Sequence, residues 1–287
     1  MRRLVMMALA MLMALGATNV HAQTLTGTLK KVMDSGAFTI GYRENALPFA
    51  FTGTDGKPAG YSVDLCKEIA VAVQQELKLS NMTVNWVPVT PENRLDSVAN
   101  GTVDIECGST TASLSRQEKV DFTLMTFVDS ASLLIAEGSG LRTINDLAGK
   151  RIGVVPGTTT EKAIGDFLRA QSIAATVVPV KDHDEGLAAL QTSKIEAYAS
   201  DRTILVGLVM QARGTSRYAI VSEDISFEPY GFMLRRDDSA FRLVANRTLA
   251  RIYRSGAIGA LYAKWFGPLG KPTPALVLMY ALQGFPE

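Results

Sequence analysis

Short apolar segments alternate with longer segments of helical periodicity along most of this chain, and the alternation limits the folds available to it. The first set predicts strands at 38–42, 83–89 and 103–107 and helices at 62–79 and 92–100. The second set predicts strands at 151–155, 176–180 and 195–200 and helices at 159–170, 184–192 and 202–212. This order favours an α/β fold with mostly parallel sheets that are covered by helices on both faces.

Two further segments have an extended pattern and lie beside the second set. They read "FVDSASLLIAE" at 127–137 and "FEPYGFMLR" at 227–235. If the chain leaves the first domain at one segment and returns at the other, the first domain is discontinuous. We therefore predict one lobe from 23–128 plus 231–287, which ends with helices at 239–255 and 257–265, and a second lobe from 129–230.

The N-terminus has the pattern of an export signal. Arg2 and Arg3 precede an apolar run at 4–17, and Val20-His21-Ala22 fits a cleavage site. We predict a cleavable signal peptide at 1–22, because a membrane span needs about 20 apolar residues. An uncleaved membrane anchor is the alternative.

The balance of charges argues against nucleic acid and anionic membranes as partners. Lysine and arginine total 29 against 28 aspartates and glutamates, so the protein has no large electrostatic field that would hold nucleic acid or an anionic membrane.

The two cysteines, Cys66 and Cys107, would enter an oxidising compartment after export. They form either one disulfide or two buried free thiols.

Polar side chains follow nearly every predicted strand, at the sheet edge where α/β proteins bind ligands. Arginine presents a planar fork of donors that matches a carboxylate, hydroxyl groups add donors, and an aspartate would suit an ammonium group. The candidates are Arg43, Arg94, Ser109, Thr111, Arg116, Thr159, His183 and Asp201. Each also has an ordinary structural interpretation, as a surface arginine or histidine or as a helix cap.

The sequence lacks the common motifs of catalytic and metal-binding sites. The chain contains no G-x-S-x-G, no H-E-x-x-H and no phosphate loop, and one of its two histidines lies in the predicted signal. We therefore expect no metal site and no cofactor.

Several motifs follow one another in a recognisable order: "GYSVDLCKEIA", "VTPENR", "ECGSTTASLSRQEKVDFT", "RIGVVPGTTTEK", "KDHDEG" and "YGFMLRRDD". With them the chain resembles the periplasmic solute-binding proteins of ABC transporters, within their glutamate/aspartate-binding branch. The resemblance implies a type II periplasmic-binding fold, with two α/β lobes joined by two crossing hinge strands. It also implies a periplasmic monomer that carries L-glutamate or L-aspartate to permease subunits in the inner membrane.

The resemblance further implies a role for each candidate. Arg116, Ser109 and Thr111 would hold the ligand's α-carboxylate, Asp201 its ammonium, and Arg43, Arg94 and His183 its side-chain carboxylate, with Thr159 donating from the second lobe. Pro91 stands where some members have a serine, so one hydroxyl contact would be missing. Phe232 stands where members often have a cysteine, so a disulfide would have to join Cys66 to Cys107.

Two alternatives remain at this point. The ligand could be another polar amino acid, such as glutamine or asparagine. The chain could also be a dehydratase-type enzyme that acts on a small carboxylate, with Glu106, Asp201 or His183 as acid or base. The extra arginines, Arg43 and Arg94, favour a binder that holds a second carboxylate.

Overall fold

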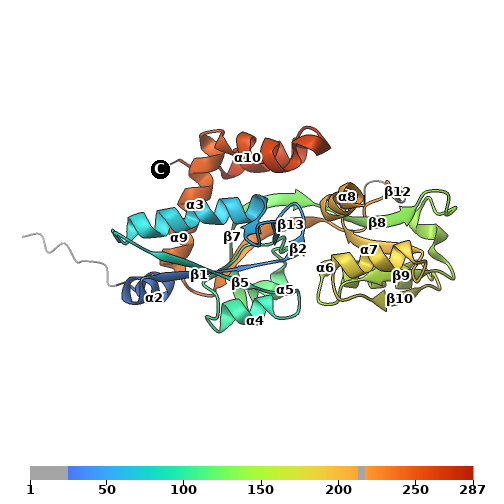
Figure 1. Cartoon of the computed structure of the whole chain (residues 1–287), viewed down its shortest axis with the longest axis horizontal. Helices are drawn as coiled ribbons and strands as arrows, with labels where there is room; N and C mark the ends of the chain where they lie inside the picture. Colours follow the sequence, from blue (N-terminus) through green and yellow to red (C-terminus); the bar gives the residue numbers. More distant parts are fainter. Residues whose placement is uncertain (1–24, 213–216, 287) are drawn as a thin grey trace, which may run out of the picture.

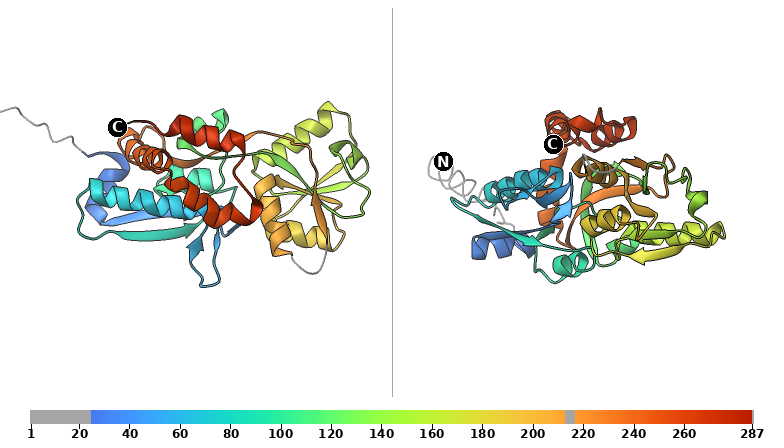
Figure 2. Two further views of the ribbon diagram at one scale, coloured as in Figure 1. Left: turned by 90° about the horizontal axis from the view of Figure 1, so that it is seen from above. Right: turned by 45° about the vertical axis from the view of Figure 1, so that its right-hand side comes forward.

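The computed structural model describes residues 25–212 and 217–286, which form two α/β lobes joined by extended strands (Figure 1). The two lobes lie side by side along the long axis, and the view from above in Figure 2 separates them equally well. The predicted signal peptide lies outside the described residues. Within the two described ranges, every helix is too short or too polar to cross a membrane.

The first lobe is built on a five-stranded sheet in the order β5-β1-β6-β13-β7. Its strands are β1 (Ala37–Tyr42), β5 (Thr83–Pro88), β6 (Ile105–Glu106), β7 (Val120–Asp129) and β13 (Glu228–Arg235). The helices of this lobe are α2 (Gly27–Ser35), α3 (Tyr61–Glu76), α4 (Arg94–Ala99), α5 (Leu114–Gln117), α9 (Ser239–Arg254), α10 (Ala257–Phe266), η3 (Gly267–Leu269) and α11 (Pro274–Gln283). A small sheet precedes α3 and contains β2 (Asn45–Ala46), β3 (Ala50–Thr52) and β4 (Pro58–Ala59).

The second lobe has a five-stranded sheet in the order β10-β9-β11-β8-β12. Its strands are β8 (Ala131–Ala136), β9 (Arg151–Val154), β10 (Thr176–Pro179), β11 (Ala197–Asp201) and β12 (Tyr218–Ile220). Its helices are η2 (Ile144–Leu147), α6 (Thr159–Ala170), α7 (His183–Gln191) and α8 (Arg202–Gln211).

Each sheet is mixed, with four strands that run in one direction and one that runs opposite to them. The reversed strand is β13 in the first sheet, antiparallel to β6 and β7, and β8 in the second sheet, antiparallel to β11 and β12. Both reversed strands lie on the passages between the lobes. The single extended segment predicted at 127–137 is in fact two strands, because β7 ends at Asp129 and β8 begins at Ala131 in the other sheet.

An aromatic cluster fills the first lobe close to the crossing strands. Phe49, Tyr61, Phe127 and Phe266 are all buried, and their ring centroids lie 4.9 to 6.3 Å apart. Aromatic pairs in these tilted and edge-on arrangements add stability beyond the area that they bury. The cluster therefore gives the strands that lead to the second lobe a rigid base.

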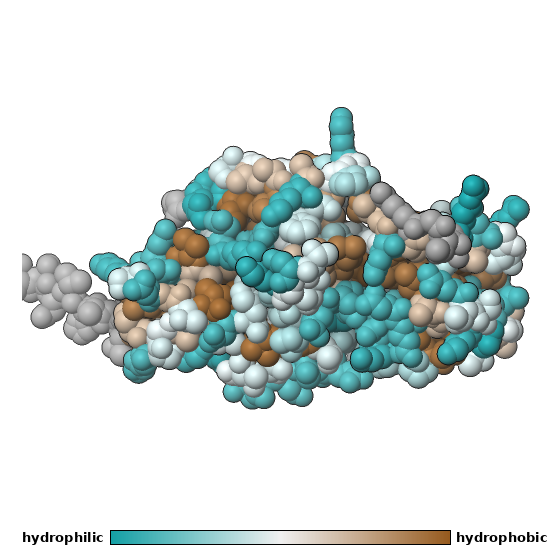
Figure 3. Space-filling model, viewed as in Figure 1, coloured by the Kyte–Doolittle hydropathy of each residue, from teal (hydrophilic) through white to brown (hydrophobic). Residues whose placement is uncertain are grey.

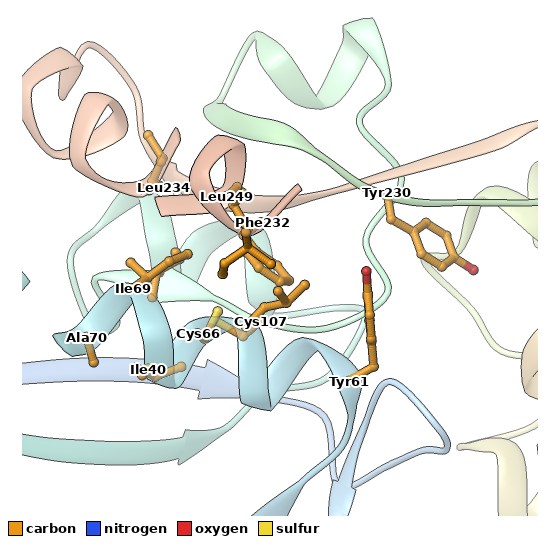
Figure 4. Close-up of a cluster of buried hydrophobic side chains, with 14 of the residues drawn as sticks. Ile40, Tyr61, Cys66, Ile69, Ala70, Cys107, Tyr230, Phe232, Leu234 and Leu249 are labelled. Atoms are coloured by element: carbon orange, nitrogen blue, oxygen red, sulfur yellow. A yellow bond between two sulfur atoms is a disulfide. The ribbon is translucent and has the colours of Figure 1, made fainter. Parts of the chain in front are cut away.

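A disulfide joins Cys66 on α3 to Cys107, which directly follows β6, with their Cα atoms 6.4 Å apart. Figure 4 shows this bridge beside Phe232 and Ile69 in the core. Of the two alternatives that the sequence left open, the structure contains the bridge. It fixes the end of β6, from which the polar loop at 108–116 begins.

Hydrophobic side chains on the face shown in Figure 3 form separate patches between hydrophilic ones. On α11, Val277, Leu278 and Leu282 are more than half exposed. Exposed apolar residues are common on the surfaces of folded proteins.

Candidate functional site

A polar cavity lies between the lobes, where the carboxyl ends of β1 and β6 face the strand-to-helix loops of the second lobe. Its lining contains seven of the eight predicted ligand-binding residues: Arg43, Arg94, Ser109, Thr111, Thr159, His183 and Asp201. Thr158, Thr160, Ser200 and Ile204 complete the lining. A wider cavity of about 400 Å³ also reaches Arg43 and runs along 89–92 of the first lobe and 179–182 of the second.

Arg116 lies beside this cavity and connects the two lobes. Its Nη1 donates to the carbonyl oxygen of Thr111 at 2.9 Å, and its Nη2 donates to the carbonyl oxygen of Gly157 at 3.4 Å. Gly157 belongs to the loop before α6 in the second lobe and has a φ of +74°, which favours glycine. The structure therefore places Arg116 within the predicted set, next to Thr111.

The three arginines are buried and close enough to affect one another. Burial, and then the charge of Arg94, lowers the pKa of Arg43 and of Arg116 to about 10. The pKa of Arg94 is also lowered, chiefly by burial. Values near 10 leave Arg43 and Arg116 positively charged at neutral pH. A buried group of like charges lacks the solvation it would have in water, so the arrangement is suited to an anion.

Glu106 is a buried carboxylate beside this group, and the sequence suggested it only as an enzyme's acid or base. Its Oε2 accepts a hydrogen bond from Thr110 at 2.8 Å, and Thr110 in turn accepts one from Nη1 of Arg94 at 2.7 Å. Burial raises the pKa of Glu106, although Arg94 and the Thr110 hydroxyl oppose that shift. Gly108 makes room for this carboxylate, since a Cβ there would lie 2.3 Å from Oε1 of Glu106.

Asp201 points toward the cavity and does not cap the helix that it precedes. It is the N-cap residue of α8, but its side chain makes no capping bond. Its Oδ1 instead accepts from the hydroxyl of Thr160 at 2.9 Å, and its Oδ2 accepts from the hydroxyl of Tyr230. Figure 4 shows the Tyr230 hydroxyl pointing away from the core of the first lobe. The capping interpretation of Asp201 is therefore wrong.

The pKa of Asp201 is raised from 3.8 to about 7, first by burial and then by the charges of Glu228 and Asp129. Because this folded-state pKa lies above the unfolded value, the folded protein holds the proton more tightly. The stabilisation from this proton is complete below about pH 4 and is lost as the pH rises through 7.

We expect the Asp201→Asn variant to become more stable relative to the unmodified protein as the pH rises from 5 to 8. Asparagine cannot ionise, so the variant avoids the buried charge that Asp201 acquires near neutral pH. Melting temperatures from circular dichroism at each pH measure the difference, and Asp237→Asn, at an exposed position, is the matched control. A constant difference between Asp201→Asn and the unmodified protein across this range would contradict the assignment.

His183 is the first residue of α7, whose cap is the side chain of the preceding Asp182. Burial and the charges of Arg43 and Arg94 lower the pKa of His183 to about 3, so the ring is neutral. Its Nδ1 lies 2.7 Å from the hydroxyl of Tyr198. If that hydroxyl donates to Nδ1, the ring proton is on Nε2, which can then donate to an anion.

Glu228 is a site residue that the sequence analysis did not identify. It begins β13, its side chain is buried, and its Oε2 accepts hydrogen bonds from the hydroxyls of Thr111 and Thr159. The available signal was a glutamate at the start of the segment predicted to cross between lobes. Thr158 caps α6 by accepting from the amide of Glu161, so Thr159 need not serve as the cap.

The lobes touch closely at a second point. Gly207 on α8 faces the backbone of Leu47, and a Cβ at Gly207 would lie 2.6 Å from the Leu47 carbonyl oxygen. Any larger residue there would push the lobes apart.

Within the described parts of the chain, no three histidine, cysteine, aspartate or glutamate side chains are grouped to hold a metal.

Comparison with known proteins identifies the family of this chain. The model of the bacterial extracellular solute-binding proteins, family 3, matches residues 38–268. A protein of Pseudomonas aeruginosa named L-glutamate/L-aspartate-binding protein is 36% identical over 262 residues, which cover 91% of this chain and 87% of that protein. The glutamate/aspartate import solute-binding protein of Salmonella typhimurium is 32% identical over 260 residues, covering 89% of this chain and 86% of its own.

A solved structure with a similar fold is that of an ancestral amino acid-binding protein described as a precursor of cyclohexadienyl dehydratase. The two chains superpose with a TM-score of 0.73 at 25% identity, over 84% of this chain and 100% of the other. This similarity supports the two-lobed type II periplasmic-binding fold.

Proposed function

Because the chain belongs to the family 3 bacterial extracellular solute-binding proteins, we propose that it is a periplasmic receptor for an acidic amino acid. It binds glutamate, aspartate or both between its lobes and delivers the ligand to the permease subunits of an ABC importer. The observation that carries this proposal is the convergence of the buried Arg43, Arg94 and Asp201 on one cavity between the lobes, with the guanidinium of Arg116 bonded to the cavity-lining Thr111 beside it. The relatives named for glutamate and aspartate support the same ligand class.

In the proposed complex, Arg116 and Ser109 hold the α-carboxylate and Asp201 holds the ammonium. Arg43, Arg94 and the neutral His183 hold the side-chain carboxylate. Arg94 is well placed for this role, because its Nε is buried and has no hydrogen-bond partner in the described part of the protein. A buried donor without a partner is costly, and a ligand oxygen would satisfy it.

Closure of the lobes completes the site. The ligand first meets the first lobe, which supplies Arg43, Arg94 and Arg116, and the second lobe then adds His183 and Asp201. A ligand that contacts both lobes stabilises the closed form, and a permease could recognise that form. On this account the lobes are those predicted from the sequence, at 23–128 plus 231–287 and at 129–230.

The Arg94→Gln variant tests the ligand class. We expect about a hundredfold loss of affinity for glutamate and aspartate, because removing one partner of a buried ion pair costs about 3 kcal/mol and each 1.4 kcal/mol is tenfold. Affinity for glutamine and asparagine should fall by less than about threefold. Isothermal titration of the purified protein, freed of bound ligand, measures all four.

The control for this experiment is Arg251→Gln, since Arg251 is exposed and only 3.9 Å from the exposed Glu68. It should bind every ligand as the unmodified protein does. Equal losses for acids and amides in Arg94→Gln would refute the role of Arg94. Tighter binding of glutamine than of glutamate by the unmodified protein would refute the acidic class itself.

We further propose that the protein binds its ligand without converting it. The curated relatives named above are binding proteins. Glu106, a buried carboxylate with a raised pKa, accepts a hydrogen bond from Thr110, which in turn accepts one from Arg94. Product analysis after long incubation with glutamate or a small carboxylate tests this part of the proposal. Detectable conversion of either compound would contradict it.

A further inference from the structure

Glu228 is the first residue of β13, a strand that passes between the lobes, and its side chain accepts hydrogen bonds from three hydroxyl groups. Its Oε2 accepts from Thr111 and from Thr159, the latter at 2.7 Å, and its Oε1 accepts from Ser226. The side chain is buried, with 1% of the residue exposed. In each of these hydrogen bonds the hydroxyl is the donor and the carboxylate oxygen of Glu228 is the acceptor.

The two hydroxyls on Oε2 come from opposite lobes. Thr111 lies in the loop after β6, whereas Thr159 is the first residue of α6, and their oxygens are 3.2 Å apart. Both threonines also line the polar cavity. Glu228 therefore ties a cavity-lining group of each lobe to a fixed point on the hinge.

A threonine hydroxyl has a single proton, and this fact decides what the cavity offers a ligand. Once that proton is donated to Glu228, the oxygen presents only lone pairs to its other neighbours. Such an oxygen can accept from an ammonium group and cannot donate to a carboxylate. In this arrangement the hydroxyls of Thr111 and Thr159 are unsuited to the carboxylate contacts that the family resemblance implied.

We propose that Glu228 is a positioning residue that selects ligands carrying an α-amine. It orients the hydroxyls of Thr111 and Thr159 as acceptors, so that together with Asp201 they form an amine subsite that spans both lobes. The inference rests on the proposed function, because it concerns the same cavity. A dicarboxylate that lacks the amine leaves these acceptors unpaired and is rejected.

Glutamate and glutarate provide the test, because they share two carboxylates and the same carbon chain and differ only in the amine. We expect the unmodified protein to prefer glutamate by at least about a hundredfold in isothermal titration. In Glu228→Ala the hydroxyls are free to rotate, so glutamate affinity should fall about thirtyfold while glutarate affinity changes by less than threefold. The preference for the amine is thereby reduced at least tenfold.

The Glu228→Gln variant distinguishes the orienting effect of Glu228 on the two threonine hydroxyls from the effect of its negative charge. An amide oxygen can still accept from both threonines while the amide NH₂ turns toward Ser226, so this variant should keep most of the preference. Ser226→Ala is the matched control, because it removes a partner of Glu228 that does not line the cavity, and its preference should equal that of the unmodified protein. A Gln variant as impaired as the Ala variant would overturn the positioning role.

The remaining outcomes also decide the question. Failure of the unmodified protein to bind either glutamate or aspartate would refute the proposed function. If it binds glutamate but Glu228→Ala loses both ligands equally, or keeps its preference within threefold, only the inference about Glu228 is overturned. Thr159→Val, which removes one hydroxyl at nearly constant shape, should reproduce part of the loss of preference even if Glu228→Ala does not fold.

Discussion

Replacing Arg116 with alanine is expected to weaken the binding of glutamate and aspartate by about a hundredfold to several thousandfold. Arg116 is 9% exposed, and its guanidinium links the loop of Thr111 to the loop of Gly157. Its removal would leave the ligand's α-carboxylate buried without its main counter-charge, and breaking a buried pair costs about 3–5 kcal/mol, or roughly a hundredfold to several thousandfold. Isothermal titration measures the loss directly.

Two further variants sharpen this result. Arg116→Lys keeps the charge but not the planar fork, so it should recover only part of the affinity. Arg242→Ala removes an arginine that pairs with Asp121 on the surface of the first lobe, and it should bind normally. Binding by Arg116→Ala within tenfold of the unmodified protein would show that another group anchors the α-carboxylate.

Removing the disulfide should produce the largest effect on stability. The bridge closes a segment with a sequence separation of 41, and the loss of chain entropy in the unfolded state predicts about 4 kcal/mol of stabilisation. In a protein of this size 1 kcal/mol corresponds to about 2–4 °C, so the Cys66→Ala/Cys107→Ala variant should melt roughly 10 °C lower. Thermal unfolding followed by circular dichroism measures the shift.

The reductant provides the control for the disulfide. Dithiothreitol should lower the melting temperature of the unmodified protein and leave that of the double variant unchanged. Glutamate affinity at 25 °C should change little, because the hydroxyl of Ser62 also holds the loop by donating to the carbonyl oxygen of Gly108 at 2.7 Å. A double variant that melts within about 2 °C of the unmodified protein would contradict the predicted stabilisation.

Local patterns predicted most of the large elements. The helix predicted at 159–170 has those bounds in the structure, and the helix predicted at 202–212 is shorter by one residue. Helical periodicity and strand-like apolar runs reflect which face of a segment is buried, and this depends little on distant residues. The shortest elements were poorly predicted: the strand expected at 103–107 is only Ile105–Glu106, and the small sheet before α3 went unnoticed.

The sequence by itself determined the α/β composition, the loops that carry Arg43, Arg94, Arg116 and Asp201, and the pair of cysteines, because each depends on residue type or local spacing. Only the tertiary structure decided the mixed sheets, the disulfide and the presence of Glu106 and Glu228 in the site. The Thr111–Glu228 hydrogen bond spans 117 residues and depends on how β13 crosses between the lobes. Whether a hydroxyl donates or accepts, and what pKa a buried carboxylate has, depends on neighbours that only folding brings together.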